Sequence, residues 1–328
     1  MSKQLSTMPI AHALNAGLRE AMEENDKVML IGEDIGQLGG VFRVTDGLQK
    51  SFGDLRVVDS PLGEAGIIGS AIGLAMAGYR PVCEIQFDGF VFPAMNQIIT
   101  QLAKYRHRSE GRVSLPVVIR IPVGGGIGAI EHHSESPEAY FAHTAGLKVV
   151  SPSSPQEAYD MIRLAVRSQD PVVFLEPKRS YWLKGEVDPA RAPQPLEKAT
   201  VVRPGNDLTL VTYGALVPVA QKVADVCAEE GRSVEVVDLR SLSPIDDASI
   251  IESVERTGRL VVAHEASRTA GLGAEIAARV QDAAFHSLEA PIIRVTGYDT
   301  PYPPSRLEED WLPGFDRILD AVDQSFNY

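Results

Sequence analysis

Residues 59–87 read DSPLGEAGIIGSAIGLAMAGYRPVCEIQF. The apolar and small residues over 64–78 indicate a helix, and the β-branched run over 80–87 indicates a strand that follows it directly. One carboxylate, Glu64, stands at the start of this apolar helix. Burying a carboxylate costs free energy and raises its pKa unless a partner shares a hydrogen bond with it. The helix macrodipole also favours an acidic residue there, so a structural and a chemical role are compatible.

The same alternation of strand and helix continues on both sides of this stretch. We expect further strands at 28–32, 115–122, 147–152 and 171–177, and helices at 9–25, 91–108 and 155–168. The strands are continuously apolar, which is typical of a parallel sheet buried on both faces. A second series follows, with strands at 208–214, 233–239, 259–266 and 291–297 and helices at 216–230, 244–256 and 273–285. Between the two series, four prolines interrupt the periodicity. The sequence therefore predicts an α/β protein with mostly parallel sheets flanked by helices: one domain over 1–185, a linker over 186–204 and a second domain over 205–328.

Composition narrows the class of protein. The 328 residues are 44% hydrophobic and 23% charged, as in an ordinary globular protein. The net charge of −13 argues against binding to nucleic acid or to an anionic membrane. The N-terminus lacks the layout of a signal peptide, and Cys83 and Cys227 lack metal-binding spacing. We therefore expect a cytoplasmic protein with reduced thiols.

A glycine-rich loop, GGGIGAIEHHSESPE (124–138), follows the predicted strand at 115–122. It matches neither phosphate-binding glycine motif, so a phosphate cradle is disfavoured. His132 and His133 lie in this loop. On an extended segment neighbouring side chains point to opposite sides, so we expect only one of the two to face a given pocket. The alternative is a solvated or capping histidine.

Small residues recur along the helix at 64–78. Gly69, Gly73 and Ala77 follow one another at four-residue intervals. Because glycine lowers helix propensity by about 1 kcal/mol relative to alanine, close packing must justify them. Both core packing and a subunit interface remain open.

Several stretches resemble one family over nearly the whole chain. They include GEDIGQLGGVFRVTDGL (32–48), the opening stretch, HSESPEAYFAHTAGLKVVSPSSP (133–155), DPVVFLEPK (170–178), VVDLRSLSPID (236–246), HEA (264–266) and GYDTPYP (297–303). The chain resembles the β subunit of the E1 component of 2-oxo acid dehydrogenase complexes, in the transketolase superfamily. The resemblance implies a transketolase-like pyrimidine-binding domain followed by a transketolase C-terminal-like domain. The segments SPEAYFAH, FLEPK, HEA and GYDTPYP favour the branched-chain branch of this family.

The resemblance assigns roles to individual residues. Glu64 matches the catalytic glutamate that hydrogen-bonds N1′ of the aminopyrimidine of thiamine diphosphate, and so promotes removal of the C2 proton. Leu62 would contact the pyrimidine through its backbone, and Gln86 and Phe90 would line its pocket. Phe90 stands where branched-chain members carry tyrosine, so it keeps the aromatic surface without the hydroxyl. His133 matches the catalytic histidine that assists acyl transfer to lipoamide.

The resemblance also implies ions and partners. A structural potassium site would use mainly backbone oxygens, at Ala165, Ser168 and Asp170. The superfamily binds Mg²⁺ and the diphosphate through a GDG motif, which this chain lacks. An E1 α subunit must therefore supply Mg²⁺ and the diphosphate site, in an α2β2 heterotetramer that serves a lipoylated E2 acyltransferase. The implied function is oxidative decarboxylation of a branched-chain 2-oxo acid with acyl transfer to lipoamide. Pyruvate or acetoin dehydrogenase β subunits are the alternative within this family, and a non-catalytic scaffold of the same fold is the alternative outside enzymes.

Overall fold

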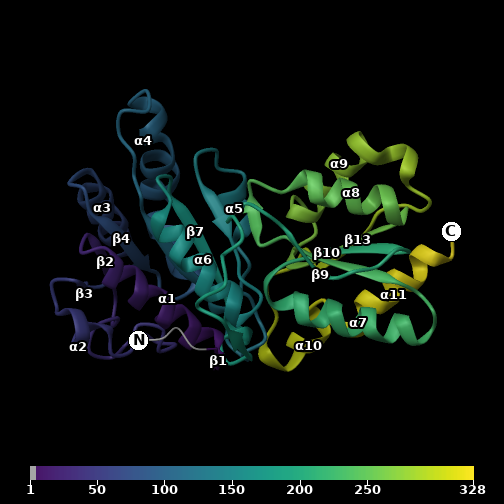
Figure 1. Cartoon of the computed structure of the whole chain (residues 1–328), viewed down its shortest axis with the longest axis horizontal. Coiled ribbons are helices and arrows are strands. Elements are labelled where there is room, and N and C mark those ends of the chain that lie inside the picture. Colours follow the sequence, from purple (N-terminus) through teal and green to yellow (C-terminus); the bar gives the residue numbers. More distant parts are fainter. Residues whose placement is uncertain (1–4) are drawn as a thin grey trace. The chain divides into compact units, whose positions relative to one another are not determined.

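The computed structural model describes residues 5–328 and divides into two compact units (Figure 1). Unit 1 comprises the described residues up to Val123 together with Tyr140–Leu196, and unit 2 comprises Gly124–Ala139 with Glu197–Tyr328. The loop 124–139 thus belongs to the second unit although it follows a strand of the first. The sequence pattern did not predict this exchange.

Unit 1 is built on a parallel sheet with strand order β6-β7-β5-β4-β2-β3. Its strands are β2 (Val28–Gly32), β3 (Val57–Asp59), β4 (Arg80–Glu84), β5 (Val118–Val123), β6 (Lys148–Val150) and β7 (Val172–Pro177). A separate antiparallel pair joins β1 (Ser6–Pro9) to β8 (Lys184–Val187). Every residue of β2, β5 and β7 is buried, which confirms the predicted doubly covered parallel sheet.

The helices of unit 1 bury apolar faces against that sheet and against each other. They are α1 (Ile10–Glu24), α2 (Leu48–Phe52), α3 (Glu64–Met76), α4 (Ala103–Arg108) and α6 (Pro155–Arg167), with short helical segments η1 (Asp88–Ala94), η2 (Asn96–Leu102) and η4 (Lys178–Ser180). Helices α1 and α6 pack together, as Figure 1 shows. Ser154 caps α6 through a side-chain bond to the amide of Glu157 (3.2 Å), and proline occupies the first helical position.

Unit 2 holds a second sheet of order β14-β13-β10-β11-β9, in which only β9 is antiparallel to its neighbour. Its strands are β9 (Thr200–Arg203), β10 (Leu208–Thr212), β11 (Val234–Asp238), β13 (Leu260–Ser267) and β14 (Ile293–Gly297), and β12 (Ser241–Ser243) lies outside this sheet. The helices are α7 (Val217–Glu229), α8 (Asp247–Thr257), α9 (Leu272–Ala284), α10 (Glu308–Trp311) and α11 (Phe315–Phe326). Short turns η3 (Glu131–His133), η5 (Gly214–Leu216), η6 (Phe285–Ser287) and η7 (Ser305–Leu307) complete it, while α5 (Glu138–Ala142) spans the unit boundary.

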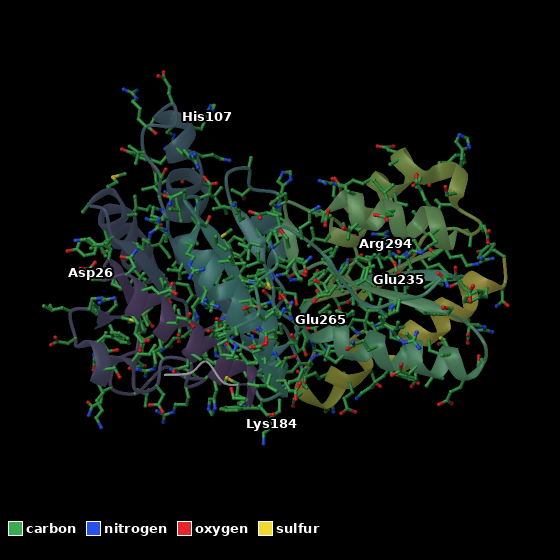
Figure 2. All side chains as sticks on the ribbon, viewed as in Figure 1. Asp26, His107, Lys184, Glu235, Glu265 and Arg294 are labelled. Atoms are coloured by element: carbon green, nitrogen blue, oxygen red, sulfur yellow. The ribbon has the colours of Figure 1, made fainter. Side chains whose placement is uncertain are left out.

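Helices cover both faces of this second sheet. Within unit 2, α7 packs with α11 and α8 packs with α9, and Figure 1 shows these pairs on opposite faces of the strands. The buried Glu235 on β11 accepts hydrogen bonds from Ser253 Oγ (2.6 Å) and Arg256 Nη2 (2.5 Å) on α8 (Figure 2). Within residues 5–328, no helix has the length and apolarity needed to cross a membrane.

Two sequence-based expectations need correction here. The segment 186–204 is not an irregular linker throughout, because β8 ends at Val187 and β9 fills Thr200–Arg203. The expected single helix over 91–108 is instead η1 as a 3-10 helix, η2 as a π-helix and α4. Pro93 lies inside η1, and because proline lacks an amide hydrogen it interrupts the regular α-helical ladder.

Candidate functional site

The first set of predicted site residues lies at the carboxyl ends of β2 and β4, the edge where open parallel sheets usually bind ligands. Glu64 is the first residue of α3 and is half-buried. Its carboxylate has no hydrogen-bond or ion-pair partner among residues 5–328. Leu62, two residues earlier, is 87% exposed. The Glu64 carboxylate and the exposed Leu62 side chain are therefore both open to contact with another molecule at this edge.

Glu33, which we did not predict as a site residue, connects the start of α3 to Gln86. The buried side chain of Glu33 accepts a hydrogen bond from the Gly63 amide (3.0 Å), immediately before Glu64. Gln86 donates to the Glu33 carbonyl (3.3 Å) and to Asp34 Oδ2 (3.1 Å). The structure thus brings Gln86 and the start of α3 together through Glu33. The signal was present in the GEDIG stretch, where two acidic residues follow a buried strand.

Phe90 belongs to a chain of aromatic side chains. It lies on η1, which packs against α3, and it meets Phe87 edge-on at 5.9 Å between ring centroids. Phe87 meets Phe42 at 5.5 Å, and Phe42 stacks on Tyr181 at 4.7 Å. The aromatic surface expected at position 90 is therefore held in place from the core of unit 1.

A buried network of charges lies behind this edge. Arg120 donates to both oxygens of Glu176 (2.7 and 2.9 Å) and to Glu84 Oε2 (2.6 Å). Tyr181 donates to Glu176 at 2.6 Å. Burial raises the pKa of Glu84, and the adjacent Arg120 opposes that shift. Removing one member would leave an uncompensated buried charge, so the network rigidifies the ends of β4, β5 and β7.

His133 lies in unit 2, in the turn η3, so the two catalytic predictions fall in different units. The expectation that His132 and His133 point to opposite sides is wrong. The segment is a 3-10 turn rather than an extended strand, and the two ring centroids lie 4.3 Å apart. His133 Nδ1 lies 3.0 Å from the His132 carbonyl oxygen, and the side chain of His133 is half-exposed.

The potassium positions surround the segment from the end of α6 to the start of β7. The carbonyl of Ala165 accepts from the Ser168 amide (3.1 Å), that of Ser168 from Arg80 (3.0 Å), and that of Asp170 from the Ser168 hydroxyl (2.9 Å). The Arg80 guanidinium opposes a second cation at these oxygens. Residues 5–328 hold no cluster of three His, Cys, Asp or Glu side chains suited to a metal. The potassium site stays a prediction.

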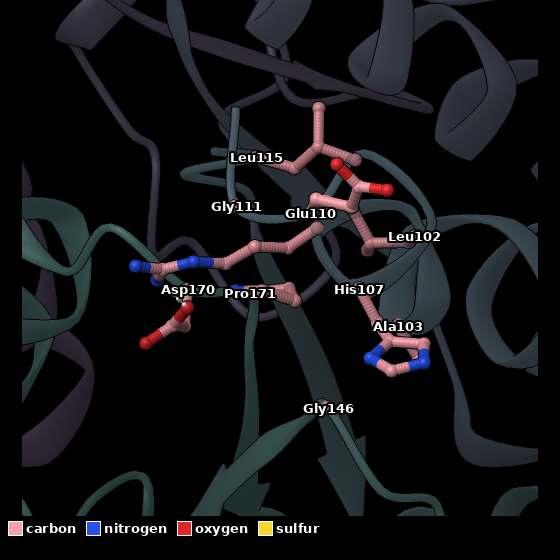
Figure 3. Close-up of a pocket in the computed structure, with 10 residues that line it drawn as sticks. Leu102, Ala103, His107, Glu110, Gly111, Leu115, Gly146, Asp170 and Pro171 are labelled. Carbon is pink, nitrogen blue, oxygen red and sulfur yellow. Dashed lines mark hydrogen bonds and ion pairs between the residues drawn. The ribbon is translucent and has the colours of Figure 1, made fainter. Parts of the chain in front are cut away.

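Figure 3 shows a pocket of about 380 Å³ beside Asp170. Residues that precede β5, β6 and β7 line it, so it lies at the amino ends of the strands, opposite the edge that carries Glu64. Its lining residues are Leu102, Ala103, Arg106, His107, Glu110, Gly111, Leu115, Gly146, Asp170 and Pro171. Arg106 is already paired with Asp170, and we assign this pocket no role in the chemistry.

Comparison with known proteins identifies the class first. The model for the transketolase pyrimidine-binding domain matches residues 6–182, and that for the transketolase C-terminal domain matches residues 197–318. A solved split-gene transketolase, an inactive β4 tetramer, superposes with a TM-score of 0.80 at 23% identity, covering 98% of each chain. Both results show a two-domain protein of the transketolase fold, as predicted.

Sequence identity to curated proteins then shows which family of this fold the chain belongs to. The chain is 60% identical to the pyruvate dehydrogenase E1 component subunit β of Leifsonia xyli subsp. xyli, covering 99% of this chain and 96% of the relative. It is 52% identical to the 3-methyl-2-oxobutanoate dehydrogenase subunit β of Mycobacterium tuberculosis (97% and 92% covered). It is 45% identical to the 2-oxoisovalerate dehydrogenase subunit β of Pseudomonas aeruginosa (97% and 94% covered). The chain belongs to the family of E1 β subunits of 2-oxo acid dehydrogenases.

Proposed function

We propose that this chain supplies the proton-sharing carboxylate of a thiamine-diphosphate-dependent 2-oxo acid dehydrogenase. The observation that carries the proposal is the half-buried Glu64 at the start of α3, whose carboxylate has no partner in the described chain, residues 5–328. Its position suits a hydrogen bond to N1′ of an aminopyrimidine, with the Leu62 backbone and the side chains of Gln86 and Phe90 around that ring. The cofactor supplies the electron sink for decarboxylation when it is bound.

The chain's own residues have separate tasks in this proposal. Glu64 holds a proton at N1′, and a nearby low-dielectric surface strengthens that bond. Glu33 fixes the turn before Glu64 through the Gly63 amide. His133 donates a proton to the lipoyl sulfur that leaves when the acyl group is transferred, because a positioned imidazole can act as a general acid. Mg²⁺ and the diphosphate belong to the α subunit, because the chain carries no GDG motif.

The exposed face of α3 supports a partner subunit rather than core packing. Gly66, Gly69 and Gly73 are exposed, and a side-chain carbon added at Gly66 or Gly73 would meet nothing within 4 Å. Nothing in the described chain therefore requires glycine at these two positions. Close approach of another backbone would require it, which is consistent with an α2β2 assembly.

The preferred substrate is the finer part of the proposal. Phrases such as SPEAYFAH favour a branched-chain 2-oxo acid, while the 60% identical relative is named a pyruvate dehydrogenase subunit. The test is a panel of pyruvate and 3-methyl-2-oxobutanoate on the chain co-expressed with its α subunit, using an artificial electron acceptor. We expect a higher kcat/KM for the branched acid. Preference for pyruvate would assign the second function, and inactivity with every 2-oxo acid would refute both.

A further inference from the structure

The loop that carries His133 forms a closed unit of its own. The Gly124 amide donates to the Glu135 carbonyl (2.8 Å) and closes its base. Within the loop, the His133 amide donates to the Ile130 carbonyl (3.0 Å), which fixes the tight turn η3. Loops whose ends are joined in this way are compact surface units. Contacts that hold the glycine-rich start of this loop therefore also affect the position of His133.

Acidic side chains of unit 2 hold that glycine-rich start. The amides of Gly126 and Gly128 donate to the two carboxylate oxygens of Glu308, at 2.8 and 3.0 Å. The Gly125 amide donates to Glu265 Oε2 at 3.3 Å (Glu265 is labelled in Figure 2). These amides have the form of an anion cradle, and carboxylates of the same chain already occupy it. A phosphate cradle, which the sequence disfavoured, is therefore not what these glycines build.

A tyrosine completes the contact around Glu308. Tyr302 Oη donates to Glu308 Oε1 (2.6 Å) and lies 3.3 Å from the Gly126 amide nitrogen. Glu308 is only 7% exposed, so its three donors replace water. A side-chain carbon at Gly125 would lie 1.9 Å from the Tyr302 oxygen. Glycine at position 125 is thus explained by the close approach of Tyr302, and glycine at 126 and 128 by positive φ (86° and 71°).

We propose that Glu308 is a positioning residue for His133, holding the loop 124–135 through the amides of Gly126 and Gly128. The catalytic part of this inference rests on the proposed function of His133. The Gly126 and Gly128 amides and the Tyr302 hydroxyl donate to both oxygens of the Glu308 side chain. A carboxylate has two acceptor oxygens, whereas a carboxamide has only one. Glu308→Gln keeps the shape of the side chain but must turn its NH₂ group toward one of the three donors.

The test compares Glu308→Gln with Glu309→Gln in the assembled α–β enzyme. Glu309 is the next residue of α10, and it is exposed, so its substitution removes the same charge without touching the loop. We call the hydrogen bonds of Glu308 to the Gly126 and Gly128 amides the clamp. Deuterium uptake of peptides from 124–139, measured by mass spectrometry, shows directly whether the clamp holds the loop. We expect uptake to be faster by about tenfold or more in Glu308→Gln, as for loss of a hydrogen bond to a charged group, and unchanged in Glu309→Gln.

Two rates then test the effect on His133. The rate with a lipoylated acceptor domain should fall about 10- to 100-fold in Glu308→Gln, as for a misplaced catalytic group, while the rate with an artificial electron acceptor stays near that of the wild type. Equal losses in the two assays, or faster exchange without any change in their ratio, would overturn the positioning role. Unchanged exchange would overturn the clamp itself, even in an assembly that shows no 2-oxo acid activity.

A second variant guards against misfolding of Glu308→Gln. Tyr302→Phe removes one donor to Glu308 and keeps the aromatic ring, which packs edge-on against Trp311 at 4.8 Å. It should change uptake of 124–139 and the ratio of the two rates in the same direction as Glu308→Gln, by a smaller factor. If Glu308→Gln does not fold, the decision rests on Tyr302→Phe. Wild-type deuterium uptake of 124–139 and a wild-type ratio of the two rates in Tyr302→Phe would then refute the inference.

Discussion

One substitution tests whether the role proposed for His133 is separate from decarboxylation. His133→Ala should reduce acyl transfer to lipoamide by about 10²–10⁴-fold and decarboxylation far less, because the departing sulfur needs a proton donor, whereas the bound cofactor would supply the electron sink for decarboxylation. The measurement compares the rate with a lipoylated acceptor domain to the rate with an artificial electron acceptor. His132→Ala is the matched control, since its ring lies beside that of His133. If both assays fall together in His133→Ala, the residue only anchors its loop.

Glu138 is a buried carboxylate whose protonation couples to folding. Burial raises its pKa to about 7, the neighbouring Glu265 adds to this, and the bond donated by Tyr213 opposes it. The unfolded chain releases the proton near its ordinary pKa, so between about pH 4.5 and 7 the folded chain binds more protons than the unfolded chain. The free energy of unfolding should therefore fall as pH rises through this window.

Glu138→Gln should remove this dependence, which is worth about 3 kcal/mol for a shift of this size. The variant gains stability relative to the wild type as pH rises from 5 to 8. Denaturant unfolding in a Trp182→Phe background isolates the signal of Trp311, which belongs to unit 2. Parallel pH profiles for the two proteins would show that Glu138 is not the titrating group.

At the scale of elements, α3 has two faces with different requirements. Ile67, Ile68, Ala71 and Ala75 face the core, while Gly73 lies on the exposed face with open space around it. Gly73→Leu should leave the chain folded, because glycine is a poor helix former and no atom of the described chain lies within 4 Å of an added side-chain carbon. It should weaken association with the α subunit at least about tenfold, since one well-packed side-chain clash costs more than 1.4 kcal/mol.

Sedimentation of the mixed subunits measures this association. Ala283→Leu on the exposed side of α9 is the control for added apolar surface. Assembly of Gly73→Leu with wild-type affinity would exclude this face of α3 from the interface. Loss of folding in the isolated variant, read by circular dichroism, would contradict the open space seen around Gly73.

The helices and strands also show which parts of the fold sequence patterns can predict. Continuous apolar strands such as β2 and β7 and amphipathic helices such as α1 and α6 lie within a few residues of their predicted bounds, because burial on one or both faces determines them. Helix α11 was not predicted, although Ile318, Ala321 and Val322 form an apolar stripe at helical spacing. Glu308 and Glu33 could not be predicted as site residues from periodicity, since their partners lie 180 and 30 positions away in the chain.

At the scale of the whole chain, the residues proposed for the site are divided between the two transketolase-type units. Unit 1 carries Glu64, Gln86 and Phe90, and unit 2 carries His133 with the clamp that holds its loop. The chain lacks the motif that binds Mg²⁺ and the diphosphate. We therefore propose that this chain contributes the proton chemistry at the pyrimidine and at the lipoyl group, and that the α subunit anchors the cofactor.

The most direct test of this assignment is hydrogen–deuterium exchange at C2 of thiamine diphosphate bound to the assembled enzyme. Glu64→Gln keeps the size of the side chain but does not share a proton with N1′, so exchange should slow by about 10²–10⁴-fold. Glu23→Gln, an exposed carboxylate on α1, is the control and should exchange at the wild-type rate. Wild-type exchange in a Glu64→Gln enzyme that still binds the cofactor would contradict the account.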